Sequence, residues 1–222
     1  MRVGHRRVAA CWLARPTVHG MTGPLVRQLR SVEIEDAAVV LGRAFQDDPL
    51  MAYAIPDDDL RAMILPGSGR PGVWLANHLG QVWCTDDLAA VACWRTPGQQ
   101  RTSAAQLHEA GASQLPQSLR DGVGSRTEPV YEYLESRRDA HDIPAAHWYL
   151  TMIGVEPGRR RQGLGSAVMS PVLSTATEQH VPVYLETFGP QNVAFYSGQG
   201  FELIETAPEP SSGLTYWLFL RA

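Results

Sequence analysis

Lysine is absent from this chain, so all 19 basic residues are arginines. A Walker-type phosphate loop needs a lysine, and so does a Schiff-base mechanism, so the sequence excludes both. The net charge of −4 gives no reason to expect nucleic acid as a partner, because proteins that bind its phosphate backbone normally carry a basic face.

Cysteine is also scarce. Cys11, Cys84 and Cys93 are odd in number and include no closely spaced pair, so we expect neither a disulfide framework nor a zinc site. A reducing, cytoplasmic setting fits this usage. The seven histidines include no pair at metal-ligand spacing, so no metal is expected. No apolar run approaches the ~20 residues of a membrane span, and no membrane partner is expected.

The length of 222 residues suits one domain with a substantial core. Residues 1–32 contain six arginines and no acidic residue, and their apolar stretch, residues 8–14, is too short for a signal peptide. We therefore expect residues 1–22 to be a disordered extension, or an over-long start assignment with Met21 as the true beginning. Residues 23–222 are expected to form a single domain.

Hydrophobic periodicity predicts strands at residues 25–30, 81–85, 88–95, 148–155, 183–187, 201–206 and 214–220. It predicts one helix that Ser31 caps and that ends before Pro49, and a short helix at 60–64 followed by a loop at 66–69. Further helices are predicted at 99–119, 128–141, 163–179 and 192–197. This order predicts an α/β (α+β) fold, with a mixed central sheet and helices on both faces.

One strand-to-helix connection carries chemistry. The strand that ends at Val155 leads into a loop with three arginines (159–161), and the next helix opens at Gly163-Leu164-Gly165. Glycines at a helix N-terminus let a ligand approach the free backbone N–H groups, and these donors bind phosphate together with the helix dipole. The dinucleotide fingerprint G-x-G-x-x-G is absent, which disfavours a Rossmann site. The loop is suited to a pyrophosphate.

Two motifs in a fixed order narrow the interpretation. The pattern R-x-x-G-x-G begins at Arg160 after a strand that ends V-x-P, and the pattern N-x-x-F-Y-x-x-x-G-F runs from Asn192 to Phe201. With them the sequence resembles the GNAT acetyltransferase superfamily. Within that superfamily, residues 80–98 and 145–205 are most similar to the puromycin N-acetyltransferases. The resemblance implies a GNAT fold with splayed central strands and acetyl-CoA as co-substrate.

The resemblance also implies site residues. Tyr196 would be the general acid, since a phenol of pKa ~10 can protonate a departing thiolate of pKa ~8.5. The backbone N–H near Ile153 or Gly154 would stabilise the oxyanion. The residues implied to bind acetyl-CoA are Ile153, Gly154, Val155, Arg160, Arg161, Gln162, Gly163, Leu164, Gly165, Ser166 and Asn192. The alternative for Tyr196 is a tyrosine of the hydrophobic core. The alternative for the strand residues Ile153 and Val155 is ordinary hydrogen-bonded pairing in the sheet.

The base is less defined. Glu186, at the end of an apolar strand, would accept the amine proton directly or through water, or would hold the ammonium; a solvated strand end is the alternative. His147 and water are the other candidates for the base. The acidic residues Asp47, Asp48 and Asp57–Asp59 would favour a cationic acceptor, although helix-end and turn chemistry explains most of them.

The expected function is transfer of an acetyl group to a primary amine of a small molecule, with an aminonucleoside antibiotic such as puromycin as the specific candidate. A protein N-terminus, a polyamine or a metabolite are alternative acceptors. A non-catalytic CoA-binding regulator is the alternative outside enzymes. The chain is expected to be a monomer or a homodimer.

Overall fold

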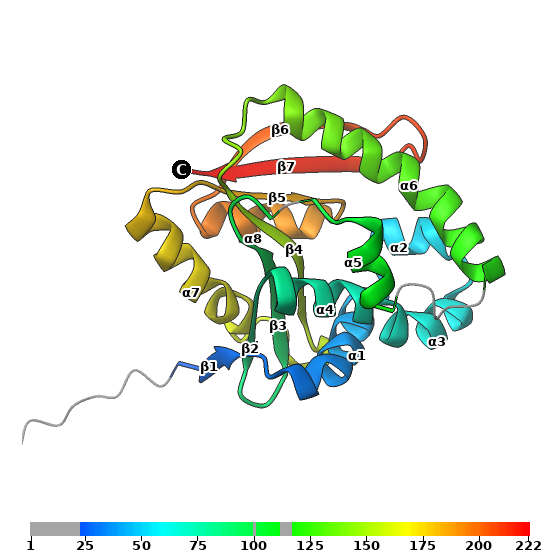
Figure 1. Cartoon of the computed structure of the whole chain (residues 1–222), viewed down its shortest axis with the longest axis horizontal. Coiled ribbons are helices and arrows are strands. Elements are labelled where there is room, and N and C mark those ends of the chain that lie inside the picture. Colours follow the sequence, from blue (N-terminus) through cyan, green and yellow to red (C-terminus); the bar gives the residue numbers. More distant parts are fainter. Residues whose placement is uncertain (1–22, 100, 112–116) are drawn as a thin grey trace, which may run out of the picture.

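A computed structural model describes residues 23–99, 101–111 and 117–222 of the chain (Figure 1). The predicted extension at 1–22 lies outside the described residues. The strands form one mixed sheet in the order β1-β2-β3-β4-β5-β7-β6. They are β1 (Val26–Gln28), β2 (Gly80–Thr85), β3 (Ala90–Arg95), β4 (Trp148–Val155), β5 (Val183–Thr187), β6 (Glu202–Pro208) and β7 (Thr215–Arg221).

The α-helices are α1 (Ile34–Ala44), α2 (Pro49–Ala54), α3 (Asp58–Ser68), α4 (Arg70–Leu79), α5 (Ala104–Glu109), α6 (Gln117–Ala140), α7 (Leu164–Gln179) and α8 (Val193–Gly198). Short 3₁₀ turns occur at η1 (Ser31–Glu33), η3 (Pro157–Arg159) and η4 (Pro190–Asn192). The mixed sheet with helices on both faces confirms the predicted architecture.

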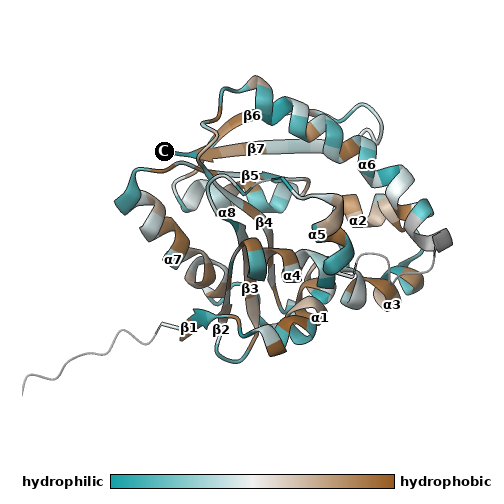
Figure 2. Cartoon of the chain, viewed as in Figure 1, coloured by the Kyte–Doolittle hydropathy of each residue, from teal (hydrophilic) through white to brown (hydrophobic). Residues whose placement is uncertain are grey.

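The helices divide between the two faces of the sheet. α7 and α8 cover one face, where Val168 and Tyr196 pack against strand residues such as Leu150 and Leu185. On the opposite face α1 and α4 cover β2 and β3, while α2 and α6 cover β5 and β7. Hydrophobic and hydrophilic residues alternate around α1 and α7 (Figure 2), as expected for helices with one face on a sheet.

The two central strands separate after a short parallel pairing. β4 and β5 pair at Trp148↔Val183 and Tyr149↔Tyr184, and at no later position among the described residues. On its other edge β4 carries a bulge at Thr151, because Leu150 and Met152 face consecutive residues of β3. A bulge bends its strand. The β5-facing backbone groups of β4 beyond Tyr149 therefore lack ladder partners, which confirms the predicted splay.

Several helices differ from the prediction. Ser31 does not cap a helix: it is the first residue of η1, and its hydroxyl donates to Asn77 Oδ1. Residues 66–69 are not a loop, since α3 continues through Pro66 to Ser68 and α4 follows directly. Packing of α1 on α3 overrides the local signal there, because a Cβ added at Gly42 would lie 2.5 Å from the backbone N of Pro66.

Three helical stretches exceed the prediction or were missed by it. The Asp-Asp-Pro sequence predicts the end of a helix, but Asp48 is also the N-cap of α2, and Pro49 is the first residue of that helix. α4 was missed because its sequence begins Arg-Pro-Gly. α6 begins at Gln117 instead of 128 and contains Gly122, Gly124 and Pro129, which local propensity disfavours in a helix.

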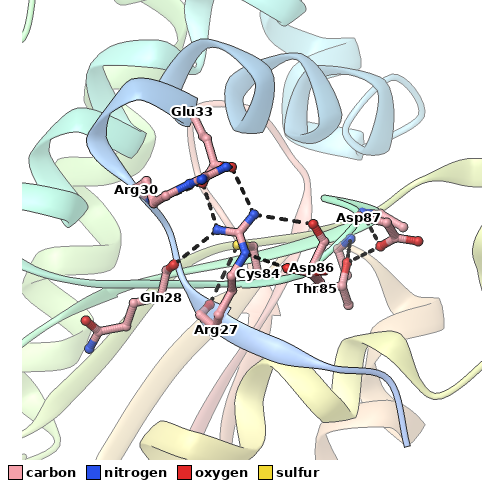
Figure 3. Close-up of polar contacts among 10 residues, drawn as sticks. Arg27, Gln28, Arg30, Glu33, Cys84, Thr85, Asp86 and Asp87 are labelled. Carbon is pink, nitrogen blue, oxygen red and sulfur yellow. Dashed lines mark hydrogen bonds and ion pairs between the residues drawn. The ribbon is translucent and has the colours of Figure 1, made fainter.

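An ion-pair network fixes the N-terminal edge of the sheet (Figure 3). The Arg27 guanidinium donates two hydrogen bonds to Glu33, at 2.7 and 2.9 Å, and a third to Asp86 Oδ1 at 2.9 Å. Hydrogen bonds from Arg30 and Arg27 hold the pKa of Glu33 well below its usual range. The network ties β1 to the β2–β3 turn and to the start of α1.

Candidate active site

A cavity of about 870 Å³ lies where β4 and β5 separate. Its walls come from the end of β4, the first turn of α7, the end of α1 and the start of α8. The lining residues are Ala44, Phe45, Asp47, Asp48, Ile153, Gly154, Val155, Pro157, Arg160, Arg161, Gly163, Leu164, Gly165, Ser166, Gln191, Asn192, Phe195 and Tyr196. The structure thus brings Tyr196 and the residues expected to bind acetyl-CoA, except Gln162, to one cavity. Glu186, His147 and the acidic residues Asp57–Asp59 do not line it.

The first turn of α7 offers backbone donors to this cavity. Gly163 is its N-cap, has a left-handed backbone with φ of 76°, and supplies no side-chain cap. The N–H groups of the next residues are therefore free of the capping partners found at most helix starts. A Cβ at Gly165 would lie 3.2 Å from the Phe195 ring, so glycine keeps this wall open. Such a cradle fits a pyrophosphate group.

The three arginines of the loop have different partners. Arg159 pairs with Asp87 at 3.1 Å and donates to Gln162 Oε1, so both side chains hold the loop in place. Arg160 lines the cavity and donates to the carbonyl oxygen of Ala44 at 3.0 Å. Arg161 lines the cavity without an ion pair among the described residues, on a backbone with φ of 62°. Arg160 and Arg161 give this end of the cavity a positive charge.

Tyr196 of α8 also lines the cavity. Its ring is buried between Phe201 and Phe219. Burial raises the pKa of the Tyr196 phenol above its ordinary value, and the nearby Asp48 and Glu186 carboxylates add to the shift. The phenol is therefore protonated across the neutral pH range, as a general acid must be.

Glu186 does not line the cavity. It lies on the opposite face of β5 from the α7 core, where its Oε1 accepts a hydrogen bond from the Tyr149 hydroxyl. Its Oε2 is buried and accepts no hydrogen bond from the described part of the chain. Burial raises the pKa of Glu186, and the Arg138 guanidinium, which lies over the Tyr149 and Tyr184 rings, partly opposes this. The nearby Tyr184 hydroxyl also lowers the pKa of the Glu186 carboxyl.

His147 stands away from the cavity. Its Nδ1 lies 2.6 Å from the carbonyl oxygen of Pro144, and its ring packs edge-on against Tyr184. It precedes Ile153 by six residues, which is roughly 20 Å along an extended strand. Burial lowers the pKa of its imidazole. The geometry favours a structural role for His147 over the role of a base.

Asp48 lies at the cavity, although the sequence pattern does not single it out from the neighbouring acidic residues. It is half-buried, whereas its neighbour Asp47 is exposed at the same wall. Burial raises the pKa of Asp48, and backbone N–H groups of Met51 and Leu50 partly offset the shift. The Asp-Pro step before an apolar run signals the helix cap, but no local pattern reveals that the cap faces a cavity.

Comparison with known proteins supports the fold. The model of the acetyltransferase (GNAT) family matches residues 127–201, from within α6 to the residue before β6. The chain has the GNAT fold. The family model covers about a third of the chain, and together with the fold it supports a relationship to the GNAT superfamily.

Two curated relatives are similar over most of the chain. A probable serine/threonine-protein kinase of Dictyostelium discoideum is 27% identical over 201 residues, which cover 81% of this chain and 21% of that protein. This chain thus spans about a fifth of that relative's length. An uncharacterized N-acetyltransferase of Schizosaccharomyces pombe is 24% identical over 187 residues, which cover 79% of this chain and 73% of that protein.

Solved structures with the same fold include a polyamine N-acetyltransferase of Drosophila melanogaster that catalyses formation of N-acetylagmatine. It has a TM-score of 0.56 and 16% identity, over 89% of this chain and 99% of that one. A putative arylalkylamine N-acetyltransferase of the yellow fever mosquito has a TM-score of 0.59 and 14% identity, over 88% and 85%. No helix among the described residues is long and apolar enough to cross a membrane.

Proposed function

We propose that this chain is an acetyl-CoA-dependent N-acetyltransferase that acts on a primary amine of a small molecule. The observation that carries the proposal is one cavity at the end of β4 that is lined by the uncapped start of α7, by two arginines and by Tyr196. This arrangement suits a ligand that has an anionic pyrophosphate at one end and a reactive thioester at the other.

The residues divide the chemistry between them. The N–H groups at the start of α7, with Arg160 and Arg161, would hold the pyrophosphate, and Asn192 would contact the pantetheine arm. The unpaired backbone of β4 near Ile153 and Gly154 would align the arm and donate to the thioester oxygen as negative charge develops there. The phenol of Tyr196 would donate its proton to the leaving sulfur.

The acceptor must approach from the side opposite the pyrophosphate. Here α2 lies beside α6, and the Arg126 guanidinium donates to the carbonyl oxygen of Ala54 at 3.1 Å. Helices that close over the acceptor side support a small molecule over an extended peptide. An aminonucleoside such as puromycin, which the sequence similarity suggests, is the first acceptor to test. Agmatine and an arylalkylamine follow, since fold relatives bear those names.

The test is thiol release from acetyl-CoA in the presence of puromycin, agmatine, spermidine, 2-phenylethylamine and a peptide with a free N-terminus. The proposal expects turnover with at least one small amine and none with the peptide. Turnover with the peptide alone would move the function to protein N-terminal acetylation. Tight acetyl-CoA binding without turnover of any amine would favour a CoA-binding regulator.

A further inference from the structure

The two carboxylate oxygens of Asp48 differ in their partners: one accepts hydrogen bonds from the backbone and the other accepts none within the part of the chain that the structure describes. Its Oδ1 accepts the backbone N–H groups of Leu50 at 3.0 Å and Met51 at 3.2 Å, which caps α2. No hydrogen bond or ion pair to its Oδ2 occurs among the described residues, yet Asp48 lines the same cavity as Tyr196. The cap therefore holds Asp48 by one oxygen and leaves the other carboxylate oxygen without a hydrogen bond from any described residue, on a side chain that lines the cavity.

Glu186 is arranged in the opposite way. Its Oε1 is engaged by the Tyr149 hydroxyl, and its Oε2 is enclosed by protein atoms. A substrate nitrogen that enters the cavity would have to displace Tyr149 to reach either oxygen. The side chain is placed to fix Tyr149 beneath the Arg138 guanidinium, which lies 5.8 Å from the Tyr149 ring centre.

We propose that Asp48 binds the ammonium group of the acceptor and accepts its proton, and that Glu186 is a positioning residue that acts through Tyr149. The inference rests on the proposed function and names the carboxylate that the acceptor contacts. Its ligand class is a primary amine that is protonated at neutral pH.

The electrostatic environment supports this division. Besides burial, the Asp48 carboxylate raises the pKa of the Tyr196 and Tyr131 phenols. In both tyrosines its contribution to the pKa exceeds that of Glu186. Asp48 also lines the same cavity as Tyr196, whereas Glu186 does not. The pKa of Asp48 is raised by burial, which brings its basicity nearer to that of the amine.

Protons and bonds balance along this route. The ammonium gives one proton to Asp48 Oδ2, and the neutral amine forms a C–N bond with the thioester carbon while the C–S bond breaks. The sulfur receives the Tyr196 proton, and the second proton lost by the nitrogen restores the phenol. Asp48 is half-buried next to the exposed Asp47, so it can release its proton to solvent. One proton leaves per turnover.

The test compares Asp48→Asn with a matched control. Asparagine keeps a side-chain oxygen that can cap α2 but removes the negative charge. Asp57→Asn is the control, because Asp57 caps α3 through the Leu60 N–H at 2.8 Å, is exposed, and does not line the cavity. We expect Asp48→Asn to lower kcat/KM for 2-phenylethylamine by about 100-fold or more, as for loss of a general base. Asp57→Asn should stay within about 2-fold, and acetyl-CoA affinity should be unchanged in both.

A binding measurement separates this inference from the proposed function. Calorimetry on the CoA-saturated protein would titrate 2-phenylethylamine and its neutral analogue 2-phenylethanol. Asp48→Asn should weaken the amine by about 10-fold or more and leave the alcohol unchanged, since a charge-assisted hydrogen bond is lost. Glu186→Gln, which keeps an acceptor for Tyr149, should leave the amine-to-alcohol affinity ratio at the wild-type value.

Other results of these measurements would overturn the assignment of Asp48, or the proposed function with it. A wild-type enzyme that acetylates amines, with an Asp48→Asn variant equal to it, would overturn the Asp48 assignment and leave the proposed function intact. A collapse of the amine-to-alcohol ratio in Glu186→Gln alone would assign the ammonium to Glu186. A wild-type protein that binds CoA but neither binds nor acetylates any amine of the panel would overturn both proposals.

Discussion

At the residue scale, the Tyr196 hydroxyl is the group whose removal separates an enzyme from a binder. Tyr196→Phe removes one hydroxyl from a buried ring, so folding and acetyl-CoA affinity should barely change. If the phenol protonates the leaving sulfur, kcat should fall by about 10²–10⁴-fold with little change in KM. Stopped-flow measurement of thiol release would check this, and near-normal turnover would remove Tyr196 from the mechanism.

The environment of Tyr196 also shapes the pH dependence. Because burial and the carboxylates of Asp48 and Glu186 raise its pKa, the phenol stays protonated beyond the ordinary tyrosine range of about 10. The alkaline decline of the wild-type rate should therefore begin above that range. The sequence motif identifies Tyr196 but does not show the carboxylates around it.

At the element scale, the first turn of α7 depends on a glycine that stands against an aromatic ring. A valine at position 165 would meet the Phe195 ring, where even a Cβ lies at 3.2 Å, and would cover the free N–H groups. Two charge-assisted hydrogen bonds at about 1.5–3 kcal/mol each would be lost. Gly165→Val should therefore weaken acetyl-CoA by about 100-fold or more by calorimetry.

Gly158→Ala is the control for this loop. Nothing lies within 4 Å of a Cβ at position 158, and the residue does not line the cavity. Its acetyl-CoA affinity should match the wild type. A folded Gly165→Val protein with wild-type affinity would show that the ligand does not approach this helix.

Besides its apolar contacts, the end of the long helix α6 is tied to the sheet through one carboxylate. Glu205 of β6 accepts hydrogen bonds from Arg137 at 2.9 Å, from the Tyr216 hydroxyl at 2.5 Å, and from His141. Burial alone would raise the pKa of Glu205, but these donors outweigh it and hold the pKa at about 2. Glu205→Gln should lower the free energy of unfolding at pH 7 by about 1–3 kcal/mol, measured in urea.

The sign of the pH effect follows from the lowered pKa. The stabilisation by Glu205 is present above the ordinary carboxyl value of 4.5, and it is lost as the pH falls from there toward 2. The difference between wild type and Glu205→Gln should narrow over that window. Glu132→Gln, at an exposed position of α6 without an ion pair among the described residues, should match the wild type at every pH. A constant difference would show that the charge of Glu205 is not involved.

At the scale of the whole molecule, the sequence predicts the sheet better than the helices that cover the acceptor side. β4 and β5 have the predicted bounds because their apolar runs end at clear turn signals. α4 and most of α6 depend on long-range packing: Pro66 of α3 sits inside a helix against Gly42, and Val130 of α6 is buried against the sheet. For the same reason, the sequence predicts the glycine turn and the arginines that line the cavity, whereas the position of Asp48 at the cavity depends on the packing of α2 and is seen only in the structure.

The splay between β4 and β5 has a consequence for the stability of the whole chain. The two halves of the sheet share two paired positions, Trp148↔Val183 and Tyr149↔Tyr184. The proposed site is lined by β4 and α7 on one side and by Asn192 and α8 on the other, so acetyl-CoA would bridge the halves. A ligand that binds the native state alone stabilises it by about 2.7 kcal/mol at 100 times its Kd. For a protein of this size, that is a rise in Tm of roughly 5–10 °C.

Differential scanning fluorimetry with acetyl-CoA, CoA and acetyl-pantetheine would check this expectation. CoA should match acetyl-CoA, since both carry the pyrophosphate that the start of α7 and the arginines would hold. Acetyl-pantetheine lacks that group, so at equal concentration it should raise Tm by much less. An equal shift with all three ligands would mean that the binding energy comes from the arm alone, in which case the arginines and the glycine turn act elsewhere.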